Sequence, residues 1–329
     1  MKSFLKLRKY FLLPLAFLFF LESSCAHVAR FKVPPPPLPR PENLVAYYRY
    51  TPLQTEPAVS ILKTNKRYIE KKVVYRQVAD TSDLRSPLVF EYYEPTAKGR
   101  HPLILITPVL GRNYGIERSF ATYFANRGFA CAIVHRRRLR LLPDENLSQV
   151  EAYFRSSIIR LRMTLDWLER QEKVDPNAIG TMGISFGGVL NTVLAGIEPR
   201  TKCHLIALAG GNLADVICYS HEKTIQRYRS QFLKRRKIGL EEFRRELRKS
   251  IISEPLEFAH FVDARNVFLF IALFDFVVGK KHGTKLVKAF GHPEIYYVPL
   301  GHYSSVLAIP FIRIKAVQFF NAQLKEESR

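Results

Sequence analysis

The feature that most constrains the fold is a short glycine-rich run, Gly183–Gly188, at a change of periodicity. Residues 178–182 form an apolar run typical of a buried strand, and residues 189–195 predict a helix that ends at Gly196. A G-x-S-x-G pattern between a strand and a helix predicts a sharp turn, which holds its serine at the carboxyl edge of a sheet. Glycines are needed there because neighbouring chains approach too closely for a side chain. We therefore predict that Ser185 is an activated nucleophile.

Strand-like and helical segments alternate along most of the chain, as they do in α/β folds. The predicted buried strands are the runs at 102–106, 129–134, 178–182, 205–209, 267–273 and 294–298. Apolar positions every three or four residues predict a helix from Ser148 to Leu168, and Ser148 with Glu151 has the spacing of a capping box. Two strand-like stretches around 68–78 and 87–93 predict an antiparallel beginning of a mostly parallel sheet flanked by helices.

Residues 212–262 interrupt this alternation and contain no strand pattern. Two helical stripes of apolar residues, at 225–232 and 240–247, lie on either side of Gly239 and predict a helical hairpin that forms a lid. Lysines and arginines line its polar faces, and the whole chain has a formal net charge of +22. Such faces are usually only solvated, but this charge also favours contact with an anionic membrane surface. No zinc-finger spacing or aromatic RNA-recognition motif occurs, so we expect no nucleic-acid partner.

The N-terminal residues 1–25 have the pattern of an export signal, because basic residues precede the apolar run 10–21. This run is too short for a typical spanning helix. Cys25 follows a small residue, as in a bacterial lipoprotein signal, although Glu22 stands where that signal usually has an aliphatic residue. Lipidation of Cys25, ordinary cleavage after Ala26 and an uncleaved anchor all remain open. We predict an exported protein of the bacterial cell envelope, periplasmic or membrane-anchored.

The rest of the chain divides into a tether and one domain. Residues 26–58 are rich in proline and predict an extended, semi-rigid tether. Residues 59–329 hold the predicted α/β domain, with the lid inserted at about 212–262. Cys203 and Cys218 could pair in an oxidising compartment, which the sequence leaves open.

A nucleophilic serine needs a base to take its proton and an acid to orient that base. Asp275 comes directly after the apolar strand 267–273, so its carboxylate is expected at the same sheet edge as Ser185. Glu294 and Asp263 are poorer candidates because they stand at the amino ends of their strands. Asp275 is therefore the predicted acid.

The predicted base is His302, which follows the last strand directly after Gly301. The order serine, aspartate, histidine along the chain is the order that α/β folds with this turn use. His292 and His101 lie at the wrong ends of strands, and His135, at a carboxyl end, is more typical of a structural histidine.

Two backbone amides are candidates for stabilising an oxyanion. One belongs to Phe186, directly after the serine. The second is expected in the loop 107–112, where we assign Leu110 with Gly111 as the next candidate. A His-Gly pair, familiar from such loops, is absent from this one.

From about residue 87 to its end, the chain resembles the α/β-hydrolase superfamily, nearest to bacterial esterases similar to dienelactone hydrolase. The residues that carry the resemblance are Leu165-Asp166-Trp167-Leu168, Val174-Asp175-Pro176, Gly183–Gly188, Asp275 with Val277-Val278, and Gly301-His302. Dienelactone hydrolases proper have cysteine at the turn, whereas this chain has Ser185, which favours a serine esterase. The resemblance implies an α/β-hydrolase fold with its lid at 212–262.

The function that follows is an exported, membrane-associated serine hydrolase of small-molecule carboxylic esters, with lipid-like esters as one class. No metal or organic cofactor is implied. Peptidase or acyltransferase activity on the same three residues remains an alternative. A membrane-tethered binding protein with an inactive hydrolase fold is another.

Overall fold

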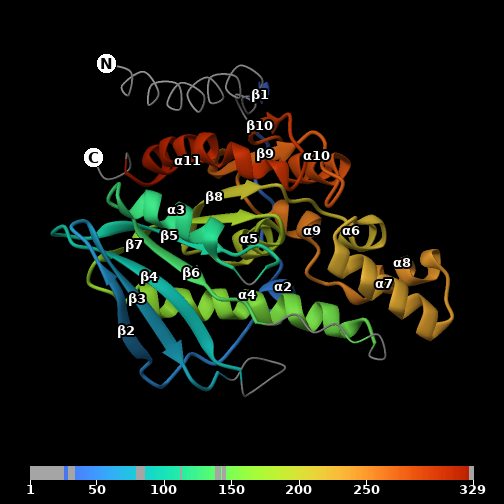
Figure 1. Ribbon diagram of the computed structural model, residues 1–329, viewed down its shortest axis with the longest axis horizontal. Helices are drawn as coiled ribbons and strands as arrows, with labels where there is room; N and C mark the ends of the chain where they lie inside the picture. The colour runs from blue at the N-terminus through green and yellow to red at the C-terminus, as the bar shows by residue number, and fades with distance from the viewer. Residues whose placement is uncertain are drawn as a thin grey trace, which may run out of the picture.

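A mixed sheet forms the centre of the molecule (Figure 1). The computed structural model describes residues 26–28, 34–78, 86–111, 113–137, 142 and 146–325. Ten strands within these residues form the sheet in the order β1-β10-β9-β8-β7-β5-β6-β4-β3-β2. Their bounds are β1 (Ala26–Val28), β2 (Ala58–Thr64), β3 (Tyr68–Tyr75), β4 (Leu88–Pro95), β5 (His101–Thr107), β6 (Ala130–Val134), β7 (Val174–Ile184), β8 (Thr201–Ala207), β9 (Val267–Ala272) and β10 (Glu294–Val298).

Strand directions divide the sheet into a parallel centre and antiparallel ends. The strands from β6 through β5, β7, β8 and β9 to β10 pair in parallel. β4, β3 and β2 add to one end as antiparallel strands, and β1 pairs antiparallel with β10 at the other end. The predicted α/β class with an antiparallel beginning is confirmed, although β2, an entirely exposed edge strand, was not predicted.

Alternating side chains of the central strands pack into two core layers, as the two-residue period of a strand requires. In β5, Leu103 and Leu105 face one layer, whereas Ile104 and Ile106 face the other. Helices α4 (Ser148–Leu168) and α5 (Phe186–Ile197) cover the first layer, and α3 (Gly115–Ala125) and α11 (Ile309–Leu324) cover the second (Figure 1). The parallel strands therefore lack a polar face because helices bury both sides.

The predicted capping box at the start of α4 is wrong. The N-cap residue is Leu147, which has no capping side chain, and the Asn146 side chain accepts hydrogen bonds from both the amide and the hydroxyl of Ser148. The Glu151 carboxylate is buried and accepts hydrogen bonds from the backbone amides of Ile252 and Ser253, each at 2.8 Å. The Glu151 side chain therefore connects α4 to the end of the lid segment, which lies beside this helix.

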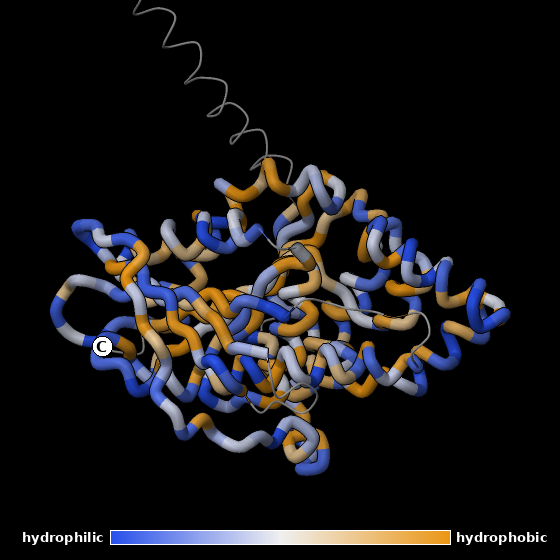
Figure 2. The backbone as a smooth tube through the Cα atoms, turned by 60° about the horizontal axis from the view of Figure 1, so that its bottom comes forward, coloured by the Kyte–Doolittle hydropathy of each residue, from blue (hydrophilic) through white to orange (hydrophobic). Residues whose placement is uncertain are grey.

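The lid segment consists of four helices, α6 (Leu213–Tyr219), α7 (Lys223–Arg236), α8 (Leu240–Ser250) and α9 (Pro255–Ala259). Helices α7 and α8 form the predicted hairpin, with their apolar stripes packed together: the rings of Phe232 and Phe243 lie 5.1 Å apart. Lys237 ends α7 in a left-handed conformation, and Gly239 precedes α8. The hairpin protrudes from the domain, with hydrophilic residues at its far end (Figures 1 and 2).

Part of the predicted tether belongs to the folded domain. Helix α2 (Glu42–Tyr47) leads into Tyr48, which is fully buried and has its hydroxyl 2.7 Å from the Ser253 hydroxyl. Tyr50 donates a hydrogen bond to Asp166 of α4. The packed domain therefore begins before residue 59. The predicted signal 1–25, including Cys25, lies outside the described residues.

The remaining elements are α10 (Lys280–Ala289) and two short 3-10 helices, η1 (Ala264–Asn266) and η2 (Ser304–Ala308). One helical stretch of the described residues, Ser304–Leu324, has the length and apolar composition of a membrane span, but part of it packs on the sheet as α11. Cys203 and Cys218 are both buried and lie in opposite core layers, so they do not pair with each other.

Candidate active site

Ser185 stands on the sharp turn between β7 and α5. Its backbone has φ 55° and ψ −122°, a conformation that side-chain-bearing residues rarely adopt. The turn is held from two sides: a Cβ atom at Gly183 would lie 2.3 Å from the Gly187 oxygen, and one at Gly187 would lie 2.2 Å from the Thr107 oxygen. Both glycines are therefore required by close backbone approach, as the sequence pattern indicated.

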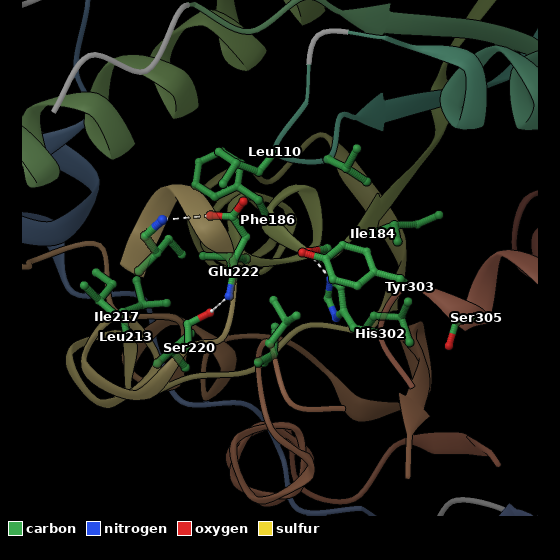
Figure 3. A pocket seen from close by; sticks show the side chains of 18 of the residues that line it. Leu110, Ile184, Phe186, Leu213, Ile217, Ser220, Glu222, His302, Tyr303 and Ser305 are labelled. Carbon is green, nitrogen blue, oxygen red and sulfur yellow. Dashed lines mark hydrogen bonds between the residues drawn. The ribbon is translucent and has the colours of Figure 1, made fainter. Parts of the chain in front are cut away.

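The three residues predicted to act together lie in one hydrogen-bonded line. The Nε2 atom of His302, a residue that Figure 3 shows in the pocket, is 2.9 Å from the Ser185 hydroxyl. The Nδ1 atom of His302 is 2.7 Å from Oδ2 of Asp275. With Asp275 ionised, Nδ1 of His302 carries a proton, and this N–H donates a hydrogen bond to the carboxylate. Nε2 is then the unprotonated nitrogen, which can accept the serine proton.

Asp275 is fixed by backbone donors as well as by His302. Its Oδ1 atom accepts hydrogen bonds from the amides of Val277, at 2.8 Å, and Val278, at 2.9 Å. Burial raises the pKa of Asp275, but the hydrogen bond and charge of His302, with the two amides, outweigh burial and leave that pKa below its ordinary value. The carboxylate is therefore ionised at neutral pH and holds the imidazole in one orientation.

The backbone amides near the serine differ in their availability. In the loop after β5, the Val109 amide donates to Glu117 at 2.8 Å, and the Gly111 amide donates to the Val109 oxygen at 2.8 Å. Within the described part of the chain, no acceptor takes the Leu110 amide. Phe186 is the first residue of α5, where amides have no partner within the helix. These contacts favour Leu110 over Gly111 as the second donor, and the oxyanion role of both amides stays a prediction.

A cavity of about 310 Å³ opens beside Ser185 and is walled mainly by apolar side chains. The lid contributes Leu213, Ile217 and Tyr228 to this wall, so the lid is part of the site. Glu222 is a polar exception that the sequence analysis missed (Figure 3). Its carboxylate accepts a hydrogen bond from the Ile225 amide at 2.8 Å and so caps the start of α7. The spacing of residues in the sequence does not reveal that a residue capping a helix also lines a cavity.

The alternative candidates for the base and the acid, His135, Asp263 and Glu294, make structural contacts. Nε2 of His135 is 2.8 Å from the buried carboxylate of Glu91, which also pairs with Arg118 at 2.6 Å. Burial raises the pKa of Glu91, but His135 and Arg118 outweigh burial and lower it to about 2. Asp263 caps η1, and Glu294 lies 2.9 Å from His27. No group of three or more metal-ligating side chains occurs among the residues described.

Comparison with solved structures identifies the fold. An acetyl xylan esterase from Paenibacillus sp. R4 is similar with a TM-score of 0.69 at 18% identity, over 86% of this chain and 93% of that chain. Acetyl xylan esterase 1 from Thermoanaerobacterium sp. JW/SL YS485 has a TM-score of 0.62 at 17% identity, over 86% and 94%. A cold-adapted esterase from an Arctic intertidal metagenomic library has a TM-score of 0.54 at 14% identity, over 80% and 97%.

These similarities confirm the predicted α/β-hydrolase fold. No family model and no curated protein matches the sequence. At these identities the comparison concerns the fold, and one fold serves many reactions. The reaction must therefore be argued from the site itself.

Proposed function

We propose that the protein is a serine hydrolase of carboxylic esters. The observation that carries the proposal is the line of two hydrogen bonds from Ser185 through His302 to Asp275, at 2.9 and 2.7 Å. Structural neighbours whose names describe esterases support the same reaction class. A serine in such a line gains nucleophilicity because its proton has an acceptor in place.

The reaction proceeds in two steps that share one proton carrier. The Ser185 oxygen attacks the ester carbonyl while the serine proton moves to Nε2 of His302. The tetrahedral oxyanion then accepts hydrogen bonds from the backbone amides of Phe186 and Leu110. The C–O bond to the alcohol then breaks, and His302 returns the proton to the leaving oxygen. Water, deprotonated by His302, attacks the acyl-enzyme, and the carboxylic acid leaves as Ser185 recovers its proton.

The cavity supports a substrate with an apolar acyl group larger than acetyl. Its volume of about 310 Å³ is at the lower end of the range of small-molecule pockets, which is more room than an acetyl group needs. The apolar wall offers few partners for a polar sugar ring, whereas an alkyl chain gains from leaving water. Lipid-like esters of medium chain length are therefore the proposed substrate class.

Export and membrane association form the second part of the proposal. The signal-like residues 1–25, the proline-rich segment and the net charge of +22 support a protein of the bacterial cell envelope, periplasmic or membrane-anchored, with Cys25 as the candidate lipidation site. The cationic outer faces of α7 and α8 add attraction to an anionic membrane surface.

Hydrolysis of p-nitrophenyl acetate, octanoate and palmitate tests the proposed reaction and chain length. We expect the highest kcat/KM with octanoate and none with Ser185→Ala. The substitution Ile217→Phe should shift the preference toward acetate because it narrows the cavity, whereas Ile252→Phe, an exposed site outside the cavity, should not. A folded wild-type protein that hydrolyses none of these esters contradicts the proposal, and faster cleavage of a matched anilide would assign a peptidase.

A further inference from the structure

Exposed apolar side chains gather on the segments that border the cavity. They are Tyr219 (44% exposed), Phe274 (59%), Phe276 (70%), Tyr303 (67%), Val306 (52%) and Leu307 (51%). We call this set the apolar rim. Single exposed apolar residues are ordinary on protein surfaces, but a contiguous group marks a site of interaction.

The fold brings the rim together around the catalytic line. Phe274 and Phe276 flank Asp275, and Tyr303 follows His302, because all of them stand where β9 and β10 end side by side. The Phe274 amide donates to the Leu300 oxygen at 3.0 Å, which joins the two loops. Tyr303 lies beside His302 at the cavity (Figure 3).

The lid side of the rim is joined to the same loops. The His221 amide donates to the Phe276 oxygen at 3.2 Å, and the two rings stack with centroids 6.2 Å apart. Tyr219 stands at the end of α6, two residues before His221. In η2, Val306 lines the cavity and Leu307 is its exposed neighbour. Rim residues or their direct neighbours therefore line the cavity from the lid, from the loop after β9 and from η2.

Cations stand at the border of the rim. Lys280 and Lys281 are exposed at the start of α10, and Nζ of Lys281 is 5.7 Å from the Tyr219 ring. Lys223 is exposed at the start of α7. The Tyr219 hydroxyl donates a hydrogen bond to the exposed Glu241, whose charge is paired with Arg244 of α8.

We propose that the apolar rim docks onto the surface of an anionic lipid aggregate, so that the cavity opens directly into the lipid. Aromatic and aliphatic side chains enter the boundary between headgroups and acyl chains, while bordering lysines contact anionic headgroups. This docking goes beyond the proposed ester hydrolysis and does not depend on it. It also differs from attraction by the basic faces of α7 and α8, because it fixes which surface of the molecule meets the lipid.

The test reports the environment of the rim itself, in the full chain. A Ser185→Ala, Cys25→Ser protein carries Leu307→Cys labelled with an environment-sensitive fluorophore; Cys131, Cys203 and Cys218 are buried. The matched control carries the label at Lys63→Cys, on the exposed strand β2 at the other end of the sheet. Both are mixed with phosphatidylglycerol–phosphatidylcholine vesicles or with phosphatidylcholine vesicles alone, and co-flotation is measured in parallel.

We expect the Leu307 label to brighten and shift to shorter wavelength with the anionic vesicles, and the Lys63 label to stay unchanged. Replacing Lys280 and Lys281 by glutamine should weaken this docking about 30-fold, from the attraction of two cations to an anionic surface. Replacing Lys66 and Lys98, which are exposed in the turns after β2 and β4, should leave it unchanged.

Three results would overturn the proposal. The protein could fail to float with anionic vesicles. It could float with no change at Leu307, which would assign binding to another part of the chain. The Leu307 signal could instead change with protein concentration in the absence of vesicles, which would assign the rim to contact with a second copy. Because Ser185 is absent from the tested protein, none of these results depends on ester hydrolysis.

Discussion

Replacing Asp275 with asparagine tests the proposed division of labour in the active site. Oδ1 of Asp275 accepts hydrogen bonds from the amides of Val277 and Val278, so an asparagine at this position would direct its single carbonyl oxygen to these two donors. Its NH₂ group would then face Nδ1 of His302. His302 would have to accept there and carry its proton on Nε2, where it could no longer take the proton of Ser185.

The expected loss is large because the wrong nitrogen is protonated while the geometry persists. An aspartate-to-asparagine change in a comparable Ser-His-Asp site lowers turnover about 10⁴-fold, equivalent to about 5 kcal/mol of transition-state stabilisation. Steady-state hydrolysis of p-nitrophenyl octanoate measures kcat, and urea unfolding checks that the fold is retained. Asp263→Asn, at the cap of η1, is the matched control and should keep its activity. A decrease in kcat of less than about tenfold in a stable Asp275→Asn protein would show that Asp275 does not set the protonation of His302.

Three further predictions concern stability. Gly187→Ala should cost about 3 kcal/mol or more, or prevent folding, because the new Cβ would lie 2.2 Å from the Thr107 oxygen; a wild-type urea midpoint would contradict this. Glu91→Gln should lower thermal stability near neutral pH. The Glu91 pKa is lowered to about 2 in the folded protein and is about 4.3 in the unfolded chain. The extra stability of the wild-type protein is therefore present above about pH 4.3 and is lost as the pH falls through about 2. A difference in stability between the two proteins that does not depend on pH would contradict this. Glu151→Ala should cost about 1–3 kcal/mol and speed hydrogen exchange at the Ser253 amide, because the carboxylate oxygen that accepts the Ile252 and Ser253 amides is lost; unchanged exchange would contradict the contact.

The sequence predicted best the features that depend on local patterns with a strong physical cause. The G-x-S-x-G turn was recognisable because close backbone approach at Gly183 and Gly187 allows no other residue. Asp275 and His302 followed from chain order, because carboxyl ends of parallel strands share one edge. The lid followed from a long segment without strands and with two apolar stripes.

Features that depend on tertiary contact could not be predicted in this way. The spacing of Ser148 and Glu151 satisfies a capping rule, yet Glu151 binds backbone amides about a hundred positions later in the chain. Tyr48 follows a proline-rich segment that resembles a tether, but its ring is buried against the domain. Glu222 caps a helix by a local rule, whereas its position in the cavity depends on how the lid packs.

Labelling of the purified protein with a fluorophosphonate probe, followed by mass-spectrometric mapping of the adduct, tests whether Ser185 is an activated nucleophile. We expect one adduct on Ser185, absent from Ser185→Ala and strongly reduced in Asp275→Asn and His302→Ala. The assay is repeated with anionic vesicles so that a closed lid does not hide the serine. A folded wild-type protein that stays unlabelled in both conditions, or that is labelled equally after Ser185→Ala, would show that Ser185 is not an activated nucleophile.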